Sequence, residues 1–246
     1  MSKPPRTQSG IATADVVQSA HLGGNAELFP QILALHVPDG ATVADVTHGS
    51  GVFWKQVAPG RYSLLATDLA MGVDCRALPY AAGSIHALVL DPPYLEGLLR
   101  GKATSRGGQG SHAAFRSYYS NGDEAAPARR WHLAVLDLYL AAAAEAHRVL
   151  CDHGIFIVKC QDEVSANRQE LTHVQLLTAF AGMGFYARDL FVLMRPNKAA
   201  VARLVRQVHA RKNHSYFLVL QKVPAGTDVA RYRTRPLVIS TECSAS

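Results

Sequence analysis

The stretch Ala87-Leu88-Val89-Leu90-Asp91-Pro92-Pro93-Tyr94 decides the fold class of this chain. Its first four residues form an apolar run that is typical of a strand buried on both faces of a parallel sheet. An aspartate and two prolines then end the strand. Open α/β sheets bind their ligands at the carboxyl ends of their strands, so this stretch predicts such a sheet with a site at Asp91.

Strands and helices alternate on both sides of this stretch. Strands are predicted at 43–46, 62–67, 85–90, 155–158, 185–194 and 215–220. Helices are predicted at 26–37, from residue 52, at about 127–150 and at about 171–181. This alternation predicts an α/β fold, with a doubly wound, mostly parallel, seven-stranded Rossmann-like sheet and an antiparallel strand near one edge.

Length and composition fit one domain with additions. A chain of 246 residues with 48% hydrophobic content can bury a full α/β core. We expect a polar N-terminal segment at 1–25, a single domain at 26–222 and a C-terminal tail at 223–246. Two polar, basic stretches, 95–130 and 195–214, do not fit the core alternation, and we interpret them as functional insertions.

Several classes of protein are disfavoured. No apolar stretch reaches the roughly 18 residues that a membrane helix needs, and residues 1–5 lack the apolar core of a signal peptide. We therefore expect a cytoplasmic protein without a membrane partner. The spacing of the cysteines suggests neither a disulfide framework nor a metal site; they are Cys75, Cys151, Cys160 and Cys243.

Residues 91–94 carry groups that are suited to holding an aromatic amine. The lone pair of such an amine is delocalised into its ring, which makes it a poor nucleophile. The Asp91 carboxylate and a backbone carbonyl fixed by Pro92 and Pro93 could each accept one amino hydrogen and aim the lone pair at an electrophile. Tyr94 could stack on the ring. The alternative is a structural turn in which Asp91 is a capping residue.

A glycine-bearing turn follows the first strand of the alternation, at Asp45-Val46-Thr47-His48-Gly49-Ser50-Gly51. A ligand could approach the backbone there because the glycines have no Cβ. Trp54 stands where the dinucleotide fingerprint has its third glycine, which disfavours a nicotinamide oxidoreductase. Asp68 is placed to hold a ribose diol or to cap a helix. Asp74 could accept from an adenine amino group or pair with Arg76.

The net charge of +6 is unevenly distributed. Residues 195–235 contain ten lysines and arginines against one acid, Asp228. This favours a polyanionic partner, because neutralised phosphates supply most sequence-independent affinity for nucleic acids. A solvated basic helix face is the alternative.

Taken in order, Asp45-x-x-x-Gly49-x-Gly51, Asp68, Asp74-x-Arg76-x-Leu78-Pro79 and Asp91-Pro92-Pro93-Tyr94 resemble a known family. It is that of the S-adenosylmethionine-dependent DNA amino-methyltransferases of the DPPY type, which act on adenine N6 or cytosine N4. The similarity spans roughly residues 23–222. It implies S-adenosylmethionine as the cofactor, S-adenosylhomocysteine as the product and double-stranded DNA as the partner. Within the family, an aspartate at position 91 followed by Tyr94 favours adenine as the target base, whereas a serine at position 91 would indicate cytosine.

The resemblance also implies roles for matching residues. The catalytic residues would be Asp91, Pro92, Pro93 and Tyr94, with the tyrosine stacked on a flipped base. The cofactor would be bound by Asp45, Thr47, Gly49, Gly51, Phe53, Asp68 and Asp74. Thr47 stands where the family often has phenylalanine, so Phe53 or Trp54 would supply the aromatic wall. Residues 25–30 loosely match the family's N-terminal cofactor motif.

Base flipping requires phosphate contacts and an element that fills the vacated stack. We expect these in the two insertions, from Arg100, Lys102, Arg106, Arg116, Tyr118, Tyr119, Arg195, Asn197, Lys198, Arg203, Arg211 and Lys212. A surface loop without a DNA role is the alternative for 95–130. Because the chain has no room for a large recognition domain, a symmetric homodimer on a palindromic site is one hypothesis.

The leading hypothesis is a site-specific DNA methyltransferase that acts on the N6 amine of a flipped adenine. Such an enzyme would be cytoplasmic and nucleoid-associated. An RNA amino-methyltransferase acting on adenine or guanine is the first alternative, because the catalytic logic is the same. A non-catalytic nucleic-acid-binding protein on this scaffold is the second.

Overall fold

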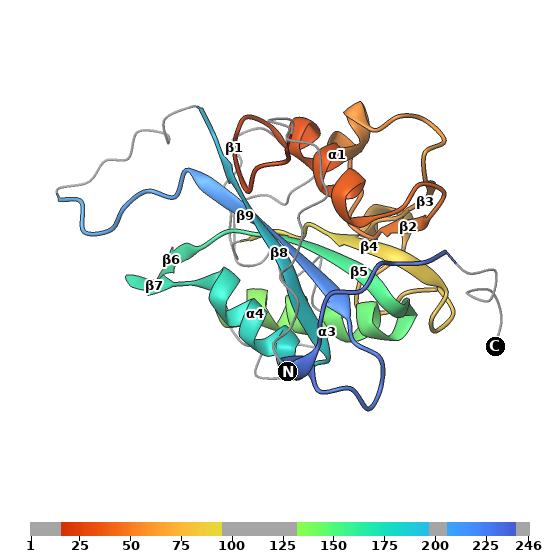
Figure 1. The fold of residues 1–246 in the computed structure, drawn as a ribbon. Coiled ribbons are helices and arrows are strands. Elements are labelled where there is room, and N and C mark those ends of the chain that lie inside the picture. Colours follow the sequence, from red (N-terminus) through yellow and green to blue (C-terminus); the bar gives the residue numbers. More distant parts are fainter. Residues whose placement is uncertain (1–15, 95–131, 197–205, 240–246) are drawn as a thin grey trace, which may run out of the picture.

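The computed structural model describes residues 16–94, 132–196 and 206–239 (Figure 1). At its centre is a seven-stranded sheet in the order β1-β8-β9-β5-β4-β2-β3. In sequence order, the strands are β1 (Ala20–Leu22), β2 (Thr42–Asp45), β3 (Ser63–Ala66), β4 (Ile85–Leu90), β5 (Leu150–Cys160), β8 (Phe185–Met194) and β9 (His214–Lys222). A separate hairpin consists of β6 (Glu163–Ser165) and β7 (Arg168–Glu170).

The sheet is mostly parallel. Neighbouring strands are parallel from β3 through β2 and β4 to β5, and β1 is parallel to β8. Only β9 runs antiparallel to its neighbours, β5 and β8. The expected fold class is therefore confirmed, with the antiparallel strand two places from one edge.

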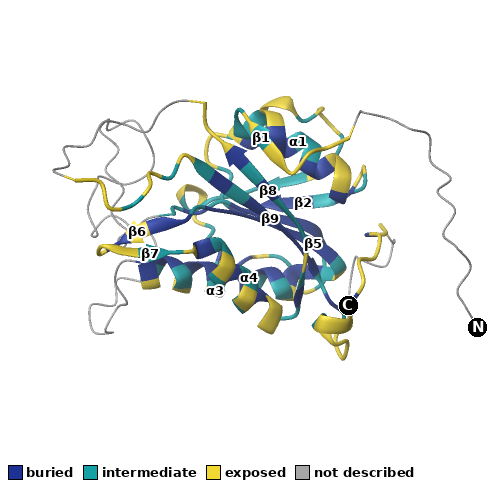
Figure 2. Ribbon diagram, turned by 60° about the vertical axis from the view of Figure 1, so that its left-hand side comes forward, coloured by how far each residue is buried: buried dark blue, intermediate teal, exposed yellow. Residues whose placement is uncertain are grey.

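Helices cover both faces of the sheet (Figure 2). On one face lie α1 (Asn25–His36) and the 3₁₀ helix η1 (Val52–Gln56), whose Phe29 and Phe53 pack on Phe217 of β9. On the other face lie α3 (His132–Val149) and α4 (Thr172–Gly182). Every residue of β4 is buried, as expected for a strand covered on both faces.

The topology creates a switch point between β2 and β4. The chain continues from β2 to β3 on one side, and from β4 to β5 on the other. Asp45 of β2 is in register with Val89 of β4, so these strands end together. In open α/β sheets, the crevice at such a point is the usual ligand site.

The structure differs from the sequence-based expectation at several places. The helix expected from residue 52 is only η1, because Pro59 lacks an N–H and disfavours a helical conformation at Ala58. The N-terminal segment contributes β1 to the sheet. In the C-terminal tail, the 3₁₀ helix η3 (Val229–Arg231) precedes the buried Tyr232. In the described part of the chain, no helix is long and apolar enough to cross a membrane.

Candidate functional site

The site predicted at Asp91 lies at the switch point. The backbone N–H of Asp91 donates to Thr47 Oγ1 over 2.7 Å, which ties the residue after β4 to the turn after β2. The glycine-bearing turn and residues 91–94 therefore meet at the carboxyl ends of β2 and β4. The strand ends explain why: β2 and β4 are parallel neighbours, and residues that follow them emerge side by side.

Residues 91–94 continue the chain directly after β4, outside regular secondary structure. Pro92 is buried, whereas Asp91, Pro93 and Tyr94 are half-buried. The Tyr94 hydroxyl donates to Asp91 Oδ1. Burial and the negative charge of Asp91 raise the pKa of Tyr94 well above its ordinary value, so this phenol stays neutral and keeps its proton. Asp91 thus serves as a hydrogen-bond acceptor within its own motif.

Lys159, near the end of β5, is a site residue that the sequence analysis missed. Its side chain is only 3% exposed, and its Nζ lies 3.9 Å from Asp91 Oδ2. The strand was expected at 155–158, and a lysine just after an apolar run usually marks a solvent-exposed end. Strand β5 instead continues to Cys160 because β9 pairs with it. The signal was the alternation itself, since Lys159 follows Ile155 and Ile157 on one face.

Asp45, at the end of β2, is 3% exposed and fully engaged by protein donors. Trp54 Nε1 donates to Oδ2 over 2.7 Å, and the Thr47 N–H donates to Oδ1 over 3.2 Å. Burial raises the pKa of Asp45 to about 6 although both hydrogen bonds oppose this shift. This carboxylate therefore holds the turn, and its protonation lies within reach of ordinary pH.

The two aromatic residues expected to wall a cofactor pocket both belong to the α1 layer. Phe53 is buried with its ring centroid 4.9 Å from that of Phe29. Trp54 meets Phe29 edge-on at 5.3 Å and is held by its bond to Asp45. The Phe53 ring also lies 5.3 Å from the Lys159 ammonium, which faces Asp91.

The glycines of the turn are needed for its backbone. Gly49 and Gly51 have φ of +54° and +68°, a region that residues with a Cβ rarely adopt. At Gly51, a Cβ would also come within 3.0 Å of the His48 ring. At Gly49, a Cβ would meet the Thr47 carbonyl oxygen at 3.9 Å and otherwise open space. A ligand could therefore approach the backbone closely at Gly49.

Asp68 and Asp74 were each expected either to bind the cofactor or to make a local contact, and the structure shows the local contact for both. Asp68 Oδ1 accepts from the Met71 N–H over 3.1 Å and caps η2 (Leu69–Met71). Asp74 pairs with Arg76, whose Nη2 lies 2.6 Å from Oδ2. Burial opposes ionisation of Asp74, but the hydrogen bonds from Arg76 outweigh it and lower its pKa. These contacts use Oδ1 of Asp68 and leave Oδ2 without a donor among the described residues.

The predicted nucleic-acid contacts divide into two groups. Arg195, Arg211 and Lys212 lie in the described chain, whereas Arg100, Lys102, Arg106, Arg116, Tyr118, Tyr119, Asn197, Lys198 and Arg203 lie outside it. Arg195 and Arg211 are exposed. Lys212 Nζ instead donates to Gln169 Oε1 over 2.7 Å. Residue 94 follows β4 and residue 195 follows β8, and these two strands run in the same direction. Both insertions therefore begin at the end of the sheet that carries Asp91.

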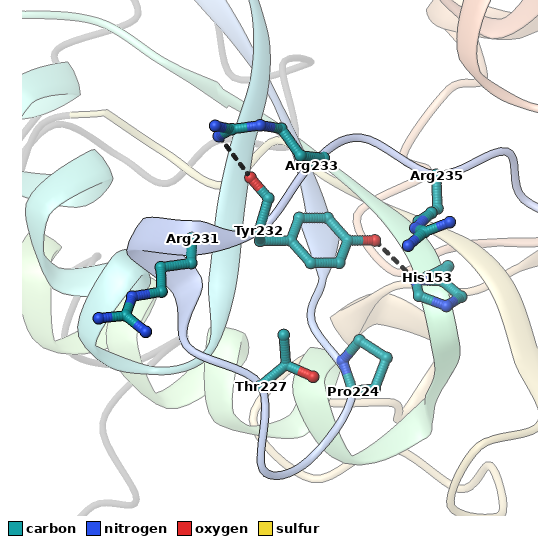
Figure 3. A pocket seen from close by; sticks show the side chains of 7 residues that line it. All are labelled: His153, Pro224, Thr227, Arg231, Tyr232, Arg233 and Arg235. Carbon is teal, nitrogen blue, oxygen red and sulfur yellow. Dashed lines mark hydrogen bonds between the residues drawn. The ribbon is translucent and has the colours of Figure 1, made fainter. Parts of the chain in front are cut away.

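A cavity of about 330 Å³ lies at the other end of the sheet (Figure 3). Its lining includes His153, from the beginning of β5, and Tyr232, whose hydroxyl lies 2.6 Å from His153 Nδ1. Three arginines of the C-terminal segment complete it: Arg231, Arg233 and Arg235. Asp91 lies near the far end of β5, so this cavity is separate from the candidate site. Across the described ranges, no group of three or more ligating side chains could hold a metal ion.

No protein-family model matches the chain, and no curated protein matches its sequence. Among solved structures, TrmN from Thermus thermophilus is 16% identical over 80% of this chain and 48% of its own length, with a TM-score of 0.44. The cytosine-N4-specific PvuII DNA methyltransferase is 13% identical over 61% of this chain and 48% of its own, with a TM-score of 0.42. A putative DNA modification methylase from Thermus thermophilus, complexed with S-adenosyl-L-methionine, is 16% identical over 82% and 59%, with a TM-score of 0.39.

This chain thus spans about half to three fifths of the length of these proteins. At such identities and TM-scores, the likeness carries no argument about activity.

Proposed function

We propose that this chain is an S-adenosylmethionine-dependent methyltransferase that acts on the exocyclic N6 amine of a flipped adenine in double-stranded DNA. One observation carries the proposal. The Asp-Pro-Pro-Tyr element, which resembles the amine-binding motif of that family, is hydrogen-bonded through Asp91 N–H to Thr47 in the glycine-bearing turn. Methyl acceptor and methyl donor would therefore meet at the switch point of the sheet.

The residues present fit such a cofactor. The backbone is open at Gly49, and Asp68 Oδ2 is left for a hydroxyl donor at the end of β3. Asp45 would hold the turn through Thr47 and Trp54 rather than contact the ligand with a spare oxygen. When bound, S-adenosylmethionine supplies a methyl group already activated on a sulfonium.

The chain itself supplies acceptors for the amine. Asp91 Oδ1 and the Pro92 carbonyl oxygen would each accept one amino hydrogen, which leaves the nitrogen lone pair directed at the donor. To reach Oδ1, the amine must replace the Tyr94 hydroxyl that now donates to it. The released Tyr94 ring is then available to stack on the base. Methylation leaves a positive charge and an extra proton on the nitrogen. Asp91 Oδ1 can accept that proton and then release it to solvent.

The electrostatics of the same edge support a nucleic-acid substrate. Both basic insertions follow strands that finish at the same end of the sheet as Asp91, and the described Arg195 and Arg211 are exposed at that end. Phosphate contacts would position the duplex, and the cost of flipping a base is a few kcal/mol. A symmetric dimer on a palindromic site remains our proposal for the assembly.

The experiment is transfer of tritiated methyl groups to genomic DNA and, separately, to total RNA. Asp91→Ala should lose about a hundredfold or more in rate while it still binds S-adenosylhomocysteine in calorimetry. Asp152→Ala, a change of an exposed aspartate near the beginning of β5, is the matched control and should keep full activity. An active Asp91→Ala variant would refute the proposal. Labelling of RNA alone would show that the substrate is RNA rather than DNA.

A further inference from the structure

Lys159 occupies a position that lysine rarely takes. Lys159 as a whole is 2% exposed, and its side chain lies on the face of the sheet that packs against α1 and η1. Lysine is almost never fully buried without a partner, because removing an ammonium from water is costly. Something at this position must therefore compensate for the charge.

Among the described residues, three aromatic rings and one carboxylate lie near the ammonium. Nζ lies 5.3 Å from the ring centroid of Phe53, 5.4 Å from that of Tyr94 and 5.5 Å from that of Phe217. These distances are within the range of a cation–π interaction. The carboxylate is that of Asp91, with Oδ2 at 3.9 Å. The rings come from η1, the catalytic motif and β9, so the ammonium joins all three to β5.

The backbone holds Lys159 in place from the opposite face. The Tyr139 hydroxyl of α3 donates to the Lys159 carbonyl oxygen over 2.8 Å. In the β5–β9 ladder, Lys159 is also in register with Phe217. The ammonium is thus presented by a rigid strand rather than by a mobile loop.

The two oxygens of Asp91 consequently differ. Oδ2 faces the Lys159 ammonium, and Oδ1 accepts from Tyr94. An amine can donate only to an acceptor, and a cation on the Oδ2 side leaves Oδ1 as the oxygen that can accept from it.

We propose that Lys159 is a positioning residue. Its ammonium is the counter-ion that holds Asp91 Oδ2 and leaves Oδ1 directed towards the substrate amine, while the aromatic rings stabilise that ammonium inside the fold. This role rests on the proposed amino-methyl transfer, which it deepens by naming what orients the amine acceptor. Lys159 acts through Asp91 and touches neither substrate nor donor in this account.

The test begins with Lys159→Met, which keeps an unbranched side chain and removes the charge. Its kcat should fall about a hundredfold, as expected when the amine acceptor is misplaced, while KM for S-adenosylmethionine stays within about threefold. Lys159→Arg restores a cation and should recover part of kcat. The matched control is Lys222→Met, a change at the other end of the sheet, where Nζ donates to the Leu150 carbonyl. A Lys159→Met enzyme with wild-type kcat would overturn the inference.

A thermal-melting cycle tests the ion pair without any need for activity. Asp91→Asn removes the negative charge 3.9 Å from the buried ammonium and should lower the melting temperature by several degrees. Adding Lys159→Met to that variant should recover most of the loss, because both charges are then gone. A double variant that melts no higher than Asp91→Asn would overturn the inference, and this comparison does not require Lys159→Met alone to fold. A wild-type chain that methylates neither DNA nor RNA would instead refute the proposed function, and the cycle would still report on the pair.

Discussion

The Tyr94 hydroxyl donates a hydrogen bond to Oδ1 of Asp91, three residues earlier in the chain. The oxygen that the proposed mechanism assigns to the substrate amine is therefore occupied by a donor from the protein. Since the pKa of Tyr94 is raised, mainly by burial, this donor persists across ordinary pH. Substrate entry must exchange one hydrogen bond for another and release the ring to stack on the base.

This exchange predicts different effects for two substitutions of Tyr94. Tyr94→Phe removes the competing donor and keeps the ring, so kcat/KM for DNA should stay within a few-fold of wild type. Tyr94→Ala also removes the stacking surface, which is worth about 1–3 kcal/mol, and should lower kcat/KM by about tenfold or more. Steady-state kinetics on a short duplex measures both. Equal losses in the two variants would contradict a stacking role for the ring.

The buried Asp45 predicts a pH-dependent stability. Burial raises its pKa from 3.8 to about 6, so the folded protein takes up a proton more readily than the unfolded chain. The contribution of this group is therefore most favourable below about pH 4, is lost progressively as pH rises towards about 6, and is constant above that. Relative to wild type, Asp45→Asn should gain up to about 3 kcal/mol between pH 4 and pH 6. Chemical denaturation at stepped pH measures the difference, and parallel curves would contradict it.

Gly51 and Gly60 form a matched pair for testing the glycine-bearing turn. Their φ values are +68° and +75°, but a Cβ would come within 3.0 Å of His48 only at Gly51, and would meet nothing within 4 Å at Gly60. Gly60→Ala should cost about 1–2 kcal/mol in unfolding free energy, with no change in S-adenosylhomocysteine affinity. Gly51→Ala should cost more and weaken that affinity. Calorimetry compares the two, and equal affinities would show that the turn does not hold the cofactor.

The exposed arginines at the edge that carries Asp91 predict a salt-dependent contribution to DNA binding. Arg195→Ala and Arg211→Ala should each weaken binding across sequences and reduce the salt slope by about one. Arg231→Ala is the control, because Arg231 is equally exposed but lines the cavity at the other end of the sheet. Fluorescence anisotropy at several salt concentrations measures the slopes. A larger change for Arg231→Ala would place the nucleic acid at that other end.

The sheet could be predicted from the sequence because its signals are local. Strand β4 carries only apolar residues but His86, and β4 and β8 have the bounds that were expected. The helix expected from residue 52 is only the 3₁₀ helix η1, which ends at Gln56, and Pro59 disfavours its continuation. Strand β1 was missed because three residues give no periodic pattern, and their pairing with β8 is a long-range contact.

The candidate site could be predicted only in part. Asp45 and Asp91 were expected at strand ends, and parallel pairing brings their regions together. Lys159 was missed because its burial depends on rings from Phe53 and Phe217, which are distant in the sequence. The bond between Trp54 and Asp45 likewise follows from the way η1 packs, which no spacing rule reveals.

The most direct test of the central claim is nucleoside mass spectrometry of DNA that has been incubated with the purified chain and S-adenosylmethionine. The account predicts N6-methyladenine in DNA treated with the wild-type chain and with Asp152→Ala, and at least about a hundredfold less with Asp91→Ala. Methylation at cytosine N4 would support the proposed amino-methyl transfer but would show that the target base is cytosine rather than adenine. The absence of any methylated nucleoside from both DNA and RNA would contradict the account.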